Sequence, residues 1–68
     1  MRYTDDQLTE AKRQIDSTLH KLRETLKTLE GRENPSRYKS QITLARRRIE
    51  AFGTAVDLIE KELDSKAE

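Results

Sequence analysis

Apolar residues recur at every third or fourth position along most of this chain. In the first half they are Leu8, Ala11, Ile15, Leu19, Leu22, Leu26 and Leu29. This spacing is the repeat of an amphipathic α-helix, whereas a half-buried strand would alternate at every second residue. Thr4 and Gln7 have the spacing of a capping box, and Gly31 lies where a C-terminal glycine cap is expected. The pattern therefore predicts a first helix over about residues 5–30.

The second half of the chain carries a more regular pattern. Its apolar positions are Tyr38, Ile42, Ala45, Ile49, Phe52, Val56, Ile59 and Leu63, with alternating spacings of four and three. This is the heptad pattern of a coiled-coil seam. Asn34 is a preferred N-cap residue and Pro35 suits the first helical position, so a second helix is expected over about residues 35–65.

Only residues 31–34 remain for the turn, and so short a connection makes the two helices antiparallel neighbours. The sequence thus predicts a single all-α domain, a coiled-coil-like hairpin. We expect facing residues to have numbers that sum to about 67, which places Thr25 against Ile42 and Thr18 against Ile49. In several such layers a large side chain faces a small one, as native packing density requires.

One partner helix cannot cover all the apolar residues. The second helix has a further stripe at Leu44, Ala51 and Leu58, with Ala55 beside it, roughly 100° around the helix from the seam. A two-fold antiparallel contact with a second copy would place Ala51 on Ala51 and Leu44 on Leu58, which predicts a homodimeric four-helix bundle. Gly53 has two open interpretations, a close-packing position in that contact or a tolerated mid-helix glycine.

Composition favours such an assembly. The chain has 68 residues, of which 40% are charged, 32% hydrophobic and 4% aromatic, and it contains no cysteine. A core this small is usually supplemented by disulfides, a structural metal or oligomerisation, and only the last is open to this sequence. No apolar run is long enough for a membrane span or a signal peptide, so a soluble cytoplasmic protein without membrane partners is expected.

The net charge of +1 conceals an uneven distribution. Residues 20–48 hold nine bases against three acids, a net of +6, while residues 1–19 have a net of −1 and residues 49–68 a net of −4. The turn end should therefore be basic and the open end acidic. Clustered cations favour phosphate backbones, so the candidate nucleic-acid-binding residues are Arg32, Arg37, Lys39, Arg46, Arg47 and Arg48. In shape, the expected dimer resembles small plasmid-type RNA-binding hairpin dimers, although fold alone does not give function.

No motif points to catalysis, a metal, a cofactor or a small-molecule substrate. His20 has no second histidine or cysteine with which to complete a metal site, and there is no glycine-rich phosphate loop. The first hypothesis is therefore a non-enzymatic, self-associating adaptor. It would dimerise through Leu44, Ala51, Ala55 and Leu58, and would expose Leu19 and Leu26 to an unidentified protein partner. The alternative is a nucleic-acid-binding homodimer that uses the basic turn end.

Overall fold

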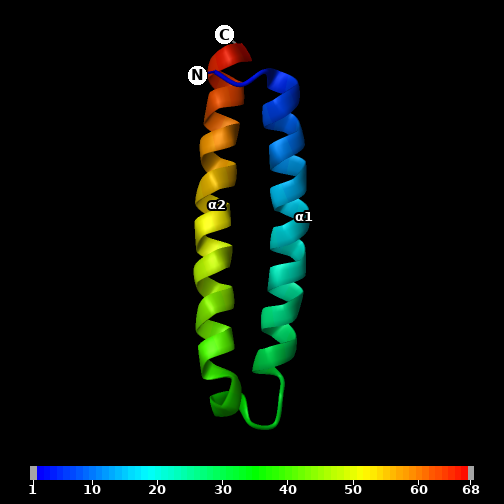
Figure 1. Ribbon diagram of the computed structural model, residues 1–68, viewed down its shortest axis with the longest axis vertical. Helices are drawn as coiled ribbons and strands as arrows, with labels where there is room; N and C mark the ends of the chain where they lie inside the picture. The colour runs from blue at the N-terminus through cyan, green and yellow to red at the C-terminus, as the bar shows by residue number, and fades with distance from the viewer. Residues whose placement is uncertain (1, 68) are drawn as a thin grey trace.

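The chain folds as a helical hairpin. The computed structural model describes residues 2–67, apart from the side chains of residues 35, 66 and 67. Helix α1 (Asp5–Glu30) is followed by a short 3-10 helix, η1 (Pro35–Tyr38), and by helix α2 (Lys39–Ala67). The two long helices run antiparallel, with the turn at one end of the rod and both chain ends at the other (Figure 1). The predicted all-α hairpin is confirmed.

The start of helix α1 follows from local hydrogen bonding. The Gln7 amide donates to Thr4 Oγ1 at 3.1 Å, and the Thr4 amide donates to Gln7 Oε1 at 2.9 Å. This reciprocal arrangement satisfies two amides that the first helical turn would leave unpaired. Asp5 and Asp6 lie in the first turn, where the helix dipole favours negative charge. The predicted capping box is confirmed.

The turn differs in detail from the expected one. Helix α1 ends at Glu30, but Gly31 has φ of −83° and does not use the left-handed conformation that favours glycine. Asn34 makes no side-chain cap; its carbonyl instead accepts a hydrogen bond from the Arg37 amide at 3.1 Å. That bond closes a 3-10 turn, so regular α-helix begins at Lys39, four residues later than expected, and it continues to Ala67.

Helix α2 presents the seam that its heptad pattern predicts. All eight of the expected positions are buried or half-buried, and the most buried are Ala45 and Val56. The regular spacing keeps these side chains on one face along the whole helix. Helix α2 is therefore packed against α1 as expected from the sequence.

Helix α1 presents a different face from the expected one. Leu19 exposes only 4% of its surface and Leu26 is half-buried, whereas Thr18 and Thr25, which were expected to face α2, are exposed. The prediction for these four residues is wrong. Leucine removes more apolar area from water than threonine, and a buried threonine hydroxyl would need a hydrogen-bond partner. The helix is therefore rotated so that its leucines enter the seam.

The alignment of the two helices along their length also differs from the expected one. Lys12 lies 3.5 Å from Glu60, and Arg46 pairs with Glu30. The residue numbers in these pairs sum to 72 and 76. A seam with sums near 71 fits both flanking pairs and the rotation of α1, and it displaces the helices by about one turn from the expected alignment.

The hairpin is an elongated body with a thin core. Its radius of gyration is 15.4 Å and its extents are 50 × 18 × 15 Å, whereas a compact domain of this length has a radius of gyration near 11 Å. Among the described residues, none has less than 2% of its surface exposed. The seam is therefore a single row of layers, and most of the circumference of each helix faces solvent.

Candidate protein interface on helix α2

The stripe of Leu44, Ala51 and Leu58 remains on the surface of α2. Leu44 is 48% exposed and Leu58 is 62% exposed, and Ala51 is also exposed. In the described part of the chain only three large apolar side chains are exposed, and two of them belong to this stripe. Isolated exposed leucines are ordinary, but a repeat every seven residues places these on one line along the helix.

A second line of residues runs beside this stripe, nearer to α1. It consists of Gln41, Arg48, Ala55 and Glu62. The last three each lie four residues after a residue of the stripe, and Gln41 lies three residues before Leu44. Ala55 is half-buried because it lies toward the seam. We call the two lines together the outer face of α2. They form an apolar centre with a basic side chain toward the turn and an acidic one toward the open end.

An apolar groove between the helices adjoins the outer face near the turn. It is lined by Leu22, Thr25 and Leu29 of α1 and by Gln41, Leu44, Ala45 and Arg48 of α2. Leu44 also borders a second hollow, which is lined by Lys39, Ser40, Thr43 and Arg47. Leu44 is thus an exposed leucine between two depressions, with an apolar wall on one side and basic and hydroxyl groups on the other.

The opposite flank of the seam has a different character. Among the described side chains, both ion pairs that join the helices lie there: Lys12 with Glu60, and Glu30 with Arg46. Gly53 falls on this flank too, and a Cβ atom added to it would meet nothing within 4 Å. Packing within the hairpin therefore does not require this glycine. Among the described residues, the hairpin has one flank bridged by ion pairs and one flank that carries the groove beside Leu44.

The predicted partner face of Leu19 and Leu26 is not an exposed surface. Leu19 is the most buried of the core residues, and Leu26 is half-buried in the same seam. Because both side chains turn toward α2, the apolar flank that the sequence assigned to α1 is absorbed by the hairpin itself. Only α2 retains an exposed apolar stripe.

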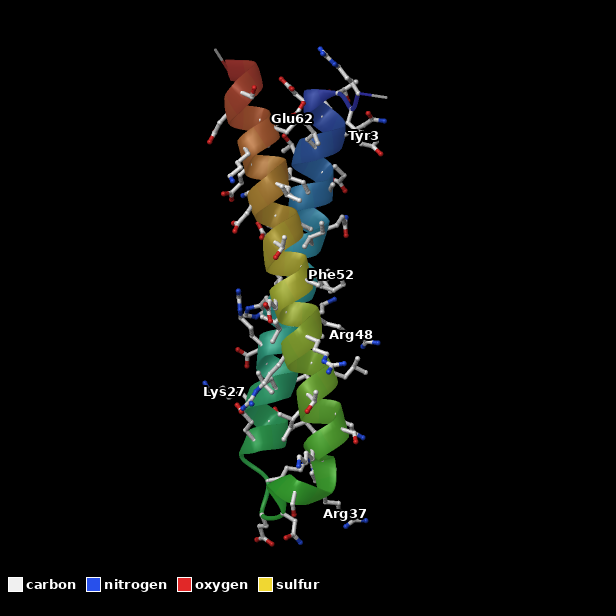
Figure 2. The ribbon with its side chains drawn as sticks, turned by 90° about the vertical axis from the view of Figure 1, so that its left-hand side faces the viewer. Tyr3, Lys27, Arg37, Arg48, Phe52 and Glu62 are labelled. Carbon is white, nitrogen blue, oxygen red and sulfur yellow. The ribbon has the colours of Figure 1, made fainter. Side chains whose placement is uncertain are left out.

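The basic residues of the turn end divide into separate groups. Arg46 donates a hydrogen bond to Glu30 and is therefore partly neutralised. Arg47 and Lys39 line the hollow beside Leu44, and Figure 2 shows Arg48 of α2 and Arg37 of η1 on the same side of the hairpin. The six predicted cations thus do not form one continuous face, because successive helical residues point about 100° apart.

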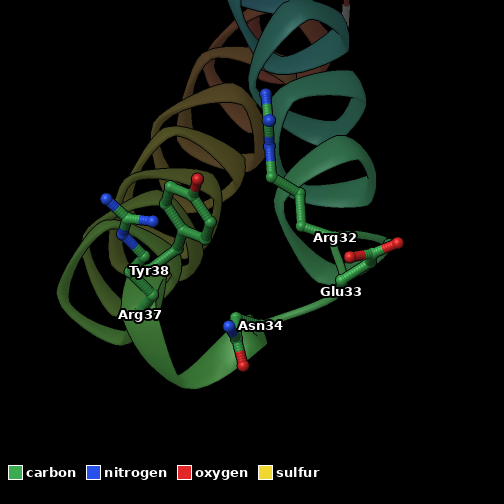
Figure 3. A pocket seen from close by; sticks show the side chains of 6 residues that line it. Arg32, Glu33, Asn34, Arg37 and Tyr38 are labelled. Atoms are coloured by element: carbon green, nitrogen blue, oxygen red, sulfur yellow. The ribbon is translucent and has the colours of Figure 1, made fainter.

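An aromatic residue joins the basic cluster at the tip of the hairpin. The Arg32 guanidinium lies over the Tyr38 ring, 5.3 Å from its centroid. An open hollow at this tip is lined by Gly31, Arg32, Glu33, Asn34, Arg37 and Tyr38 (Figure 3). Sequence reasoning assigned Tyr38 to the seam alone. Its position at the last layer, beside the turn, was the signal that could have placed it at the tip.

Other chemistry on the described surface is sparse. His20 is exposed, and within residues 2–67 no three histidine or acidic side chains gather as a group that could hold a metal ion. Glu10 has a pKa below its ordinary value because Gln14 and Arg13 donate hydrogen bonds to its carboxylate. Neither described long helix has an apolar stretch sufficient to cross a bilayer. The outer face of α2 is thus the strongest candidate for function.

Comparisons of the chain with protein families, with curated proteins and with solved structures found no match.

Proposed function

We propose that this chain is a small, non-enzymatic cytoplasmic protein that self-associates through the outer face of α2 and acts as a helical interaction module. The observation that carries the proposal is the exposure of Leu44 and Leu58, with Ala51 between them, on a helix already packed against α1. A helix with two apolar faces needs two neighbours. The hairpin supplies only one.

The exposed surface area supports a second neighbour. Folded monomers of 8.0 kDa expose about 4,450 Å² by the usual scaling with mass, and this hairpin exposes 5769 Å². The excess of roughly 1,300 Å² is larger than the ~800 Å² that each partner loses in an interface of standard size. A partner of standard size on one face would remove more than half of this excess.

The outer face is suited to a copy of itself. Leu44 and Leu58 are each seven residues from Ala51, so a two-fold axis through Ala51 brings each leucine to the other in the second copy. Alanines at the crossing allow two helices to approach closely, and the leucines then close the contact on either side. The proposed dimer is a four-helix bundle with α2 and its copy at the centre.

An adaptor role toward a different protein is also part of the proposal, and it needs a surface outside the dimer contact. Leu19 cannot supply that surface because it is buried, and Leu26 is half-buried. The open hollow at the tip, around Tyr38, lies outside the two lines of the outer face and offers such a surface.

Sedimentation of the wild-type chain and of Ala51→Glu tests self-association. We expect the wild type to sediment at about twice 8.0 kDa and Ala51→Glu to sediment as a monomer with lower helicity by circular dichroism, because a carboxylate at the crossing would be desolvated without a partner. Ser17→Glu is the matched control, since Ser17 is exposed on the side of α1 that faces away from the seam. A monomeric wild type at high concentration, or a fully dimeric Ala51→Glu, would overturn the proposal.

Nucleic-acid binding at the tip is a second candidate, favoured by the position of Tyr38. An aromatic ring flanked by Arg32 and Arg37 offers a stacking surface beside cations, the combination used for single strands. A titration of labelled single-stranded RNA and DNA against salt tests this role. Binding should weaken steeply as salt rises and should be lost in Arg37→Gln. Absence of affinity at low salt excludes it.

A further inference from the structure

We infer that the second copy lies antiparallel on the outer face of α2, with its direction set by Arg37 and Arg48 of one copy opposite Glu62 of the other. This inference rests on the proposed self-association and adds its geometry. The turn of each hairpin would lie beside the open end of its partner.

The charge order along the outer face supports this direction. From the turn to the open end, the residues of the outer face are Gln41, Leu44, Arg48, Ala51, Ala55, Leu58 and Glu62. The seven-residue spacing of the stripe continues to Arg37, in η1, at the turn and to Ser65 at the open end. Both cations precede Ala51 and the one carboxylate follows it. Neither arginine is engaged by an ion pair among the described side chains. A parallel copy would bring arginines onto arginines and Glu62 onto Glu62, whereas an antiparallel copy brings opposite charges together.

The positions of the charges fit an antiparallel contact whether the two-fold axis passes through Ala51 or between Ala51 and Ala55. If the two-fold axis passes through Ala51, the position opposite Glu62 is residue 40, three residues from Arg37. If the axis passes midway between Ala51 and Ala55, that position is residue 44, four residues from Arg48. In both cases an arginine lies within about one helical turn of the carboxylate of the second copy, which its long side chain can reach.

The groove beside Leu44 provides the apolar part of the same contact. With the axis through Ala51, Leu58 of the second copy arrives at Leu44, and so at the groove whose walls include Leu22 and Leu29. The other flank of the hairpin is bridged by ion pairs, so the apolar side is the one left open to a helix. Apolar contact and charge direction therefore select the same face.

Charge-reversal variants test the direction. We expect Arg37→Glu/Arg48→Glu and Glu62→Arg each to weaken self-association by about fivefold to thirtyfold at low salt, because two symmetric pairs are lost in each dimer. The triple variant, and an equimolar mixture of the two variants, should recover most of the affinity, since each restores opposite charges across the contact. Arg23→Glu/Lys27→Glu makes the same change in net charge as the double reversal at exposed positions of α1, off the outer face, and it should have little effect.

A distance measurement provides an independent test. The chain has no cysteine, so Asn34→Cys creates a single labelling site at the turn, where the asparagine side chain makes no cap hydrogen bond. Residue 34 is 17 positions from Ala51, so spin labels in an antiparallel dimer should lie about 50 Å apart at 1.5 Å per residue. A short separation, together with charge reversals that do not weaken binding, would show a parallel dimer and overturn both this inference and the pairing of Leu44 with Leu58, while self-association itself would stand. A chain that remains monomeric would instead overturn the proposed self-association.

Discussion

Leu19 and Thr18 are neighbours in sequence with opposite surroundings: Leu19 is buried in the seam, and Thr18 is exposed. We therefore predict that Leu19→Ala lowers the free energy of unfolding by about 2–5 kcal/mol, the usual range for truncating a core leucine. That is comparable with the whole stability of about 3–5 kcal/mol that a core of this size supplies. Urea unfolding followed by circular dichroism at 222 nm measures the loss.

Thr18→Ala is the control for this prediction. The Thr18 hydroxyl only donates to the Gln14 carbonyl in its own helix, at 3.1 Å, and alanine is the better helix former. Its unfolding free energy should therefore stay within about 0.5 kcal/mol of the wild type or rise slightly. A larger loss in Thr18→Ala than in Leu19→Ala would show that the threonine face belongs to the seam.

Replacement of Gly53 by alanine should stabilise the protein. A Cβ at this position has open space around it, and alanine in a helix interior is favoured over glycine by about 0.5–1 kcal/mol. Because Gly53 lies on the flank bridged by ion pairs, the dissociation constant of the proposed dimer should not change. Thermal unfolding and sedimentation equilibrium measure the two quantities. A weakened dimer would show that the missing side chain serves an interface after all.

The capping box at the start of α1 should contribute measurably to the free energy of unfolding. Thr4→Ala removes the oxygen that accepts from the Gln7 amide, and we expect a loss of about 1 kcal/mol in unfolding free energy. Thr9→Ala, at an exposed position inside the same helix, is the matched control. Equal stabilities for the two variants would mean that the first turn contributes nothing to the folded hairpin.

Lowering the pH should remove the contribution of Glu10 to the stability of the folded chain. Its pKa is lowered in the folded chain by hydrogen bonds from Gln14 and Arg13, so its stabilising effect is present above the ordinary carboxyl range of about 4 to 4.5 and is lost as the pH falls below it. Glu10→Gln should therefore melt below the wild type at pH 7, and the difference should shrink as the pH falls below the ordinary carboxyl range. Glu24→Gln makes the same charge change at another exposed position of α1 and is the control for this prediction. A difference for Glu10→Gln that persists in acid would assign the effect to packing.

The hairpin itself could be predicted because its signals are local. The capping box of Thr4 and Gln7 needs only four residues, and the heptads of α2 need only one helix. The length of the turn then makes the helices antiparallel. What could not be predicted at the turn was the hydrogen bond between Arg37 and Asn34, because a 3-10 start and an α-helical start suit the same residues.

The rotation of α1 could not be predicted from the apolar pattern of that helix alone. Leu8, Ile15, Leu22 and Leu29 belong to a seam completed either by the small residues Ala11, Thr18 and Thr25 or by Lys12, Leu19 and Leu26. Both choices have heptad spacing, so periodicity alone cannot separate them. The choice between the two sets depends on the free energy of apolar burial over the whole interface. Burial of Leu19 and Leu26 outweighs the cost of bringing Lys12 into the seam with them.

The candidate interface was accessible to sequence reasoning for a different reason. Leu44, Ala51 and Leu58 repeat every seven residues on a helix whose seam was already assigned, so their exposure followed from geometry. The groove beside Leu44 could not be predicted in this way, because its walls include Leu22 and Leu29, whose placement depends on the rotation of α1. Likewise, the contact of Arg32 with Tyr38 depends on the path of the turn.

The thin seam has a consequence for how the folded state is maintained. No described side chain is fully shielded within one hairpin, so a partner that covers α2 adds directly to the free energy of folding. The melting temperature should then rise with protein concentration, and refolding should contain a second-order step. For the proposed dimer, dilution would therefore raise the fraction of unfolded chain open to proteases, and the amount of protein present would govern how long each molecule lasts.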